Sequence, residues 1–187
     1  MATNKNLESI ANSFAELVLG ILQERDADAF AGKTTMKKKA TMEYDGKLRI
    51  SGMDIFNEST YISAVSFYSS EKAMASHQAI GATCFYVLKE KAPLLYKNLG
   101  LSGFNDEDDD QMVEYFGKFV TSVVDKFKSK AVGLGYSSLI ASPPANYINS
   151  VPVGIDFSPD QFDQYQISFP YKGNPTMAAD ITMAAAK

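Results

Sequence analysis

Two long segments of the chain carry apolar residues at the spacing of an amphipathic helix. In the first, apolar side chains recur every three or four residues from Leu7 to Leu22, and the polar residues 24–28 then end the helix. The second segment is longer, and we place it at about residues 109–132. Its apolar stripe consists of Met112, Phe116, Phe119, Val120, Val123, Phe127 and Ala131. Each segment therefore predicts a helix with one buried face.

Other segments alternate apolar and polar residues, as half-buried strands do. Residues 40–50 predict a β-hairpin, because two alternating runs flank Asp45-Gly46, a pair that accepts the positive φ angles of a tight turn. Residues 61–68 are rich in β-branched and aromatic side chains and predict a third strand. After Gly133 and Gly135 the period changes from helix to strand. We expect the remaining strands at residues 139–141, 164–169 and 177–183, the last two joined by a turn at 172–175.

Shorter helices are predicted between these strands. Ser69 and Ser70 are suitable N-caps for a helix over residues 71–81. Residues 84–96 also suggest helix, interrupted by Pro93, and an acidic run at 105–110 leads into the long helix. Helices and hairpins are thus mixed along the chain, which predicts an α+β domain with a mainly antiparallel sheet.

The composition fits one globular domain. The chain has 187 residues, of which 45% are hydrophobic and 21% charged, so it can bury a sizeable core. A net charge of −4 disfavours binding to nucleic acid or to an anionic membrane surface. No apolar run approaches the roughly 20 residues of a membrane span. The polar start, residues 1–6, gives no sign of a signal peptide, and we expect a cytoplasmic protein.

Local motifs in the chain have simpler explanations than catalysis or ligand binding. The Gly-Lys-Thr at 32–34 lacks the first glycine of a phosphate-binding loop, and the acids at 105–110 lack the spacing of a calcium loop. The Ser-x-x-Lys at 69–72 fits helix capping, and the lysines at 33 and 37–39 suit an edge strand. Cys84 and His77 are single, which excludes an internal disulfide and a Cys/His zinc site. We therefore predict no metal site and no cofactor of the protein's own.

The long helix at 109–132 also has an informative polar face. Lys118, Thr121, Ser122 and Asp125 follow one another at the spacing that brings side chains together on one surface, opposite the apolar stripe. This row is the best local candidate for contact with a partner. An ordinary solvated helix face explains the same periodicity, so the pattern alone leaves both interpretations open.

Several short motifs in the second half of the chain resemble one known family. They are Phe-Gly-Lys-Phe-Val-Thr at 116–121, Gly-Leu-Gly at 133–135 and Ser-Pro-Pro at 142–144. Upstream, the strand at 61–67 and the segment at 70–74 fit the same order of elements. The chain resembles the CheX branch of the CheC/CheX/FliY phosphatases of bacterial chemotaxis, in which a helix with an Ile-Gly-Glu-Leu-x-Asn type signature precedes a strand closing on proline.

The resemblance implies a fold, an activity and partners. Members of the family share an antiparallel sheet with two long helices across one face, and CheX forms a homodimer. They hydrolyse the aspartyl phosphate of CheY-type response regulators, and the regulator supplies the magnesium. The Glu of the docking helix pairs with a lysine of the regulator, and its Asn positions the attacking water. The implied domain covers residues 1–187, with 84–105 as a helical insertion and acidic linker.

This sequence departs from the family at both motif positions. Lys118 stands where the Glu is expected, and Thr121 stands where the Asn is expected. Two like charges about 4 Å apart cost on the order of 1 to 4 kcal/mol, so Lys118 reverses the expected pairing with the regulator's lysine. Thr121 offers one hydroxyl in place of a carboxamide. No shift of the alignment restores the pair, because Gly117 follows Glu114 at the third position.

Three functions remain open at this point. We favour a CheX-like signalling domain that binds a CheY-type response regulator without efficient hydrolysis, through Lys118, Thr121, Ser122 and Asp125. The second is an active phosphatase in which Thr121 positions the water and Asp125 or Ser122 assists. The third is a non-catalytic homodimeric scaffold. In each of them any magnesium belongs to the partner regulator.

Overall fold

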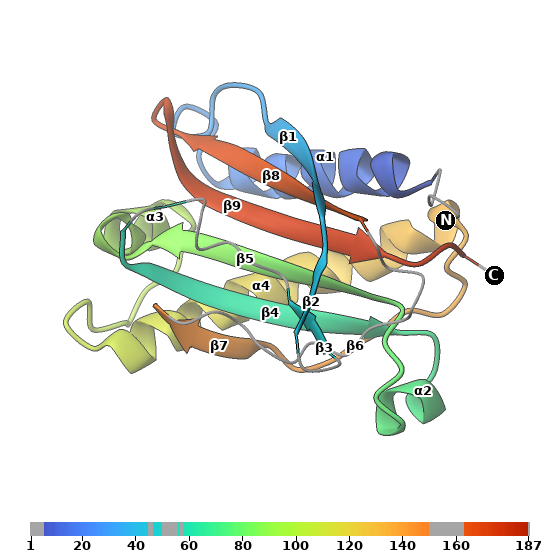
Figure 1. Cartoon of the computed structure of the whole chain (residues 1–187). Helices are drawn as coiled ribbons and strands as arrows, with labels where there is room; N and C mark the ends of the chain where they lie inside the picture. Colours follow the sequence, from blue (N-terminus) through green and yellow to red (C-terminus); the bar gives the residue numbers. More distant parts are fainter. Residues whose placement is uncertain (1–5, 45–46, 50–55, 57, 150–162, 187) are drawn as a thin grey trace.

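The computed structural model describes residues 6–44, 47–49, 56, 58–149 and 163–186. Its centre is a seven-stranded antiparallel sheet with the strand order β1-β8-β9-β5-β4-β6, in which β7 also pairs with β4 (Figure 1). The strands are β1 (Thr35–Ala40), β4 (Thr60–Tyr68), β5 (Gly81–Leu88), β6 (Ile140–Ala141), β7 (Ala145–Ile148), β8 (Asp163–Tyr171) and β9 (Asn174–Met183). The α+β class and the antiparallel sheet expected from the sequence are confirmed.

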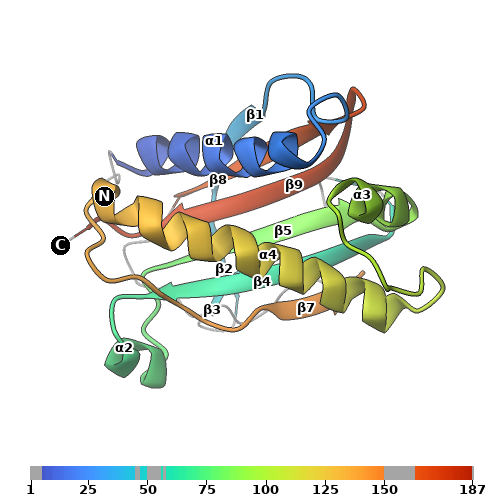
Figure 2. The same ribbon diagram turned by 180° about the vertical axis from the view of Figure 1, so that it is seen from behind.

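Two long helices, α1 (Leu7–Arg25) and α4 (Asp109–Ala131), lie side by side across one face of this sheet (Figure 2). Their apolar stripes form the main core with the sheet residues beneath them. Phe127 of α4 is central to it, with its ring edge-on to Phe14 at 5.0 Å and tilted to Phe67 at 5.7 Å. Both helices and their buried faces are as the periodicity predicts.

The bounds of α4 follow from its end residues. The side chain of Asp108 accepts a hydrogen bond from the backbone N–H of Gln111, which caps the helix, and Asp109 and Asp110 stand in the first turn, where the helix dipole favours negative charge. A 3-10 turn, η2 (Val132–Leu134), follows the helix, and Gly135 then takes a left-handed conformation with φ of 97°. The acidic run at 105–110 thus serves the start of α4, as expected.

The expected helix over residues 84–96 is wrong in its first half. Residues up to 88 belong to β5, and helix is confined to η1 (Lys89–Lys91) and α3 (Ala92–Asn98), with Pro93 in the first turn of α3. Because β5 lies between β4 and β9 and is covered on both faces, nearly all its side chains are buried and leave no period to read. Residues 84–88 thus belong to the central sheet and not to a helical insertion, and the helix expected in 84–105 begins only at residue 89.

The helix expected over residues 71–81 is also shorter than predicted. α2 (Glu71–Ala75) is capped by the side chain of Ser70, as expected, but His77 has a positive φ of 56°. The backbone N–H of Gln78 bonds back to the carbonyl of Ala73, so the chain turns away and enters β5 at Gly81. A residue in the left-handed region cannot continue a helix, which explains the early end.

The other face of the sheet carries a second, smaller core. Its buried members include Ile62, Cys84 and Tyr86, and the Tyr86 hydroxyl donates to the carboxylate of Asp180 at 2.9 Å. The hairpin β2 (Met42–Tyr44) and β3 (Lys47–Arg49) lies on this face, opposite the two long helices (Figure 1). It confirms the expected hairpin for residues 42–44 and 47–49, whereas Ala40 belongs to β1 and pairs with Asp163 of β8. The turn residues 45–46 and residue 50 lie outside the described part. No helix in the described ranges is both long and apolar enough to cross a membrane.

Candidate functional site

The outer face of α4 carries the row of polar residues that the sequence singled out. The structure leaves Lys118, Thr121, Ser122 and Asp125 exposed while the opposite side of the helix is buried. Figure 2 shows this helix running the length of the sheet with its outer side uncovered in the described structure. The four residues therefore share one accessible surface, which we call the α4 face.

Lys118 is bound to its own helix in the free chain. Its Nζ lies 2.9 Å from Oε1 of Glu114, one turn earlier, and 4.4 Å from the centre of the Tyr115 ring. The hydrogen bond to Glu114 raises the pKa of Lys118, and the ring adds a weak cation–π contact. The side chain thus leans toward the N-terminal end of α4. An exposed pair of this kind contributes little to stability, so a partner can displace it.

The two hydroxyl groups of the α4 face both donate hydrogen bonds to backbone carbonyls of their own helix. The Thr121 hydroxyl donates to the carbonyl of Gly117 at 2.9 Å, and the Ser122 hydroxyl donates to the carbonyl of Phe119 at 2.7 Å. Ser and Thr commonly bond back to a helix in this way. Each oxygen then faces solvent mainly as an acceptor, which is a poorer means of orienting a water than a carboxamide.

Asp125 stands one turn beyond Thr121 and is partnered as well. Its carboxylate pairs with Lys128 at 3.2 Å, and both groups are on the surface of the helix. The α4 face and its ion-pair partners therefore alternate in charge, with Glu114 and Lys118 toward one end and Asp125 and Lys128 toward the other. Such a surface suits recognition of a partner that also presents both signs of charge.

A further polar residue, which no sequence pattern indicated, lies beside this row. Asn146 of β7 is exposed, and its carboxamide lies against the backbone of Gly117. A Cβ added at Gly117 would lie 2.7 Å from Nδ2 and 2.8 Å from Oδ1 of Asn146. The signal in the sequence was Gly117 itself, because a glycine inside a helix is unfavourable unless something approaches closely.

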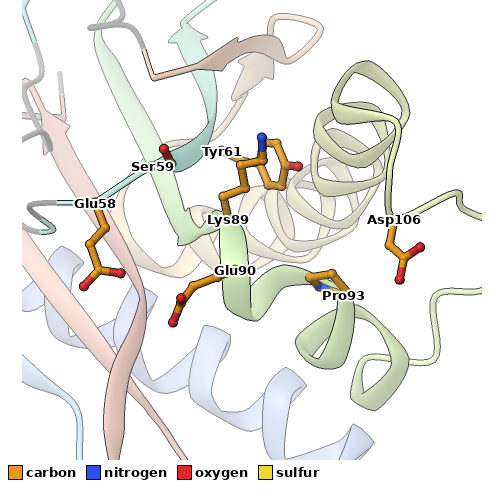
Figure 3. Close-up of a pocket in the computed structure, with 7 residues that line it drawn as sticks. All are labelled: Glu58, Ser59, Tyr61, Lys89, Glu90, Pro93 and Asp106. Carbon is orange, nitrogen blue, oxygen red and sulfur yellow. The ribbon is translucent and has the colours of Figure 1, made fainter.

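A second candidate is a pocket of about 620 Å³ near the N-terminal end of α4 (Figure 3). Its lining consists of Glu58, Ser59, Tyr61, Lys89, Glu90, Pro93 and Asp106. Beside it, Asp109 accepts from the Tyr61 hydroxyl at 2.7 Å and pairs with Lys89 at 2.5 Å. The hydrogen bond from Lys89, and to a smaller extent that from Tyr61, lowers the pKa of Asp109. Burial raises the pKa of Tyr61.

These contacts give the pocket a structural role. They join β4, η1 and the first turn of α4, and they use the one lysine of the lining. Within the described ranges no group of three or more acidic, histidine or cysteine side chains is arranged to hold a metal. The pocket therefore offers less defined chemistry than the α4 face.

The two single residues Cys84 and His77 lie outside the helices in which the sequence predicted them. Cys84 is buried in β5, whereas His77 is exposed after α2. Gly32 precedes strand β1 and not a helix, so the segment is no phosphate loop. β1 lies at the outer edge of the sheet, and its Lys38 pairs with Asp163 at 2.8 Å.

The likeness of this chain to known proteins is one of structure. No protein-family model and no curated protein matches the sequence. A putative chemotaxis protein from Desulfovibrio vulgaris Hildenborough is similar at a TM-score of 0.57 and 10% identity, over 97% of this chain and 98% of that one. FliY of Thermotoga maritima is similar at a TM-score of 0.55 and 12% identity, over 99% of this chain and 92% of that one. CheX of Desulfovibrio desulfuricans is similar at a TM-score of 0.54 and 11% identity, over 94% of this chain and 99% of that one.

These likenesses extend over nearly the whole chain and over nearly the whole of each compared structure. The protein is an α+β domain of the class in which two long helices cover one face of an antiparallel sheet. More particularly, it has the fold of the CheC, CheX and FliY chemotaxis proteins. At sequence identities near 10%, the similarity establishes the fold alone. The evidence for function therefore comes from the α4 face.

Proposed function

We propose that the protein is a chemotaxis-type signalling domain that binds a CheY-type response regulator through the α4 face, without efficient hydrolysis of its aspartyl phosphate. One observation carries the proposal. The row at 118–125 is exposed on the helix that corresponds to the docking helix of the resemblance, in a chain whose fold is that of chemotaxis proteins. Single-domain size and a cytoplasmic location are part of the same proposal.

The chemistry of the α4 face supports the absence of efficient hydrolysis. Lys118 brings a positive charge to the position where a carboxylate is expected to meet the regulator's lysine, and at about 4 Å this repulsion costs on the order of 1 to 4 kcal/mol. The Thr121 hydroxyl is committed to the carbonyl of Gly117. Neither side chain therefore repeats the pairing and water-positioning roles that the resemblance assigns to these positions.

The two alternatives have less support from the geometry. An active phosphatase using Thr121, Ser122 and Asp125 would first have to break two hydroxyl bonds to backbone carbonyls and the Asp125–Lys128 pair. A homodimeric scaffold needs a contact surface of its own. We keep the homodimer as a secondary prediction, to be checked by light scattering at high protein concentration.

The experiment that tests the proposal is a titration with a CheY-type receiver domain charged with acetyl phosphate and Mg²⁺. Lys118→Glu should tighten binding by about fivefold or more, because it replaces a repulsion with an attraction. The matched control is Lys72→Glu, which makes the same charge change at an exposed position on α2, away from α4 (Figure 1). An equal effect of the two variants, or no binding by the wild type, would contradict the proposal.

A further inference from the structure

Asn146 lies on the same side of the sheet as α4. In the register of β7 with β4, Asn146 is paired with Ser63, and the neighbouring pair is Tyr147 with Ile62. Tyr147 packs with the second core, whereas Ile148 packs with the core under the helices. Because successive residues of a strand point to opposite faces, Asn146 and Ile148 both point toward α4.

The absence of a side chain at Gly117 allows Asn146 to reach the helix. Both polar atoms of the carboxamide lie within 2.8 Å of the position that a Cβ would take, and Cγ lies at 3.2 Å. A larger residue at 117 would therefore occupy the space that the carboxamide now fills. The glycine and the asparagine form one unit, built from residues 29 positions apart in the chain.

Thr121 of the α4 face and Glu114, the ion-pair partner of Lys118, lie next to this unit. Glu114 precedes Gly117 by three positions and Thr121 follows it by four, so both are its neighbours on the helix surface. Glu114 is engaged with Lys118, and the Thr121 proton is donated to the Gly117 carbonyl. Asn146 is an exposed residue, and no hydrogen bond to its carboxamide is found among the described residues. Asn146 thus adds a donor and an acceptor that the helix itself does not offer.

We propose that Asn146 completes the docking surface by donating a hydrogen bond from Nδ2 to an oxygen of the partner's phosphorylated site. This inference rests on the proposed function. A phosphoryl group and the carboxylates around it present only acceptors near neutral pH, so a neutral donor is the group that they can use. Gly117 has the matching role of holding the carboxamide at the edge of the α4 face.

The test is the affinity of variants for the receiver domain charged with acetyl phosphate and Mg²⁺. Asn146→Ala should weaken binding about tenfold, the usual effect of losing a hydrogen bond to a charged group. Asn146→Asp should weaken it further, because a carboxylate would face the partner's oxygens. Gly117→Ala should weaken it as well, since the new methyl group displaces the carboxamide. The double variant Gly117→Ala/Asn146→Ala should bind no worse than Asn146→Ala alone.

Two control variants make the substitutions elsewhere. Asn12→Ala removes an exposed carboxamide from α1, and Gly20→Ala adds a methyl group at a helical position with no atom within 4 Å. Both should bind like the wild type. Wild-type affinity in the Asn146 variants, or tighter binding by Asn146→Asp, would overturn the role of Asn146 while leaving the proposed function intact. Failure of the wild type itself to bind would overturn both.

Discussion

The contact between Gly117 and Asn146 makes a prediction about stability that needs no partner. Replacing a helical glycine by alanine usually stabilises a protein by about 0.5 to 1 kcal/mol, because the unfolded chain loses conformational freedom. The chain offers two such glycines in its two long helices. At Gly20 the new Cβ meets nothing within 4 Å, whereas at Gly117 it would lie 2.7 Å from the Asn146 carboxamide.

The two substitutions should therefore differ in magnitude. For Gly20→Ala we expect a gain of about 1 kcal/mol in the free energy of unfolding. In Gly117→Ala the carboxamide has to retreat from 2.7 Å to an ordinary contact of at least 3.4 Å. Forcing a side chain out of its preferred rotamer costs about 0.5 to 1.5 kcal/mol, which cancels most of the gain. In the Asn146→Ala background, Gly117→Ala should recover the full gain.

Urea unfolding followed by circular dichroism measures these differences directly. The double-mutant cycle of Gly117→Ala with Asn146→Ala should give a coupling energy of about 0.5 to 1 kcal/mol, as is usual for residues in contact. The same cycle of Gly20→Ala with Asn146→Ala should give none. If Gly117→Ala stabilises as much as Gly20→Ala with Asn146 present, the contact is not as described and the reasoning is refuted.

Three further predictions concern the rest of the fold. Phe127→Ala should lower the free energy of unfolding by about 3 to 5 kcal/mol in urea titrations, because it leaves a cavity at the centre of the main core. A loss below about 1 kcal/mol would argue against that packing. Burial raises the pKa of the Cys84 thiol, so a thiol reagent should modify it only as fast as the protein unfolds, and rapid labelling of the native protein would show that β5 is uncovered. Tyr61→Phe should destabilise by about 1 kcal/mol near pH 7, since it removes a donor to the partly exposed Asp109 carboxylate. The pKa of Asp109 is lowered in the folded state, so its contribution to the free energy of unfolding is present above the ordinary pKa of an aspartate and is lost as the pH falls through the folded-state pKa. Equal stability of Tyr61→Phe and wild type at all pH values would count against this contribution.

The long helices could be predicted from the sequence because their periods are unambiguous. The α4 stripe and its capping acids set its bounds to within one residue, and the polar face at 118–125 followed from the same pattern. The resemblance of short motifs to one family then predicted the fold. The structure confirms it, since solved chemotaxis proteins with only 10 to 12% sequence identity to this chain have a similar fold. Local periodicity is reliable where one side of an element is buried and the other is wet.

The errors arose where tertiary context outweighed local pattern. β5 is covered on both faces, so its apolar run at 84–88 resembled a buried helix, and the left-handed conformation of His77 shortened α2. The contact of Asn146 with Gly117 joins a strand edge to a helix, and no spacing rule relates two residues so far apart in sequence. A glycine inside an amphipathic helix indicates only that something approaches closely.

The central claim is that the α4 face docks a CheY-type receiver domain while Lys118 and Thr121 prevent efficient hydrolysis. It is tested most directly by phosphate release from a receiver domain of the same organism, charged with acetyl phosphate and Mg²⁺, with wild type compared against Lys118→Glu/Thr121→Asn. Wild type should leave the receiver's own rate of phosphate release unchanged, and the double variant should accelerate it. Acceleration by the wild type, or no acceleration by the double variant, would contradict it.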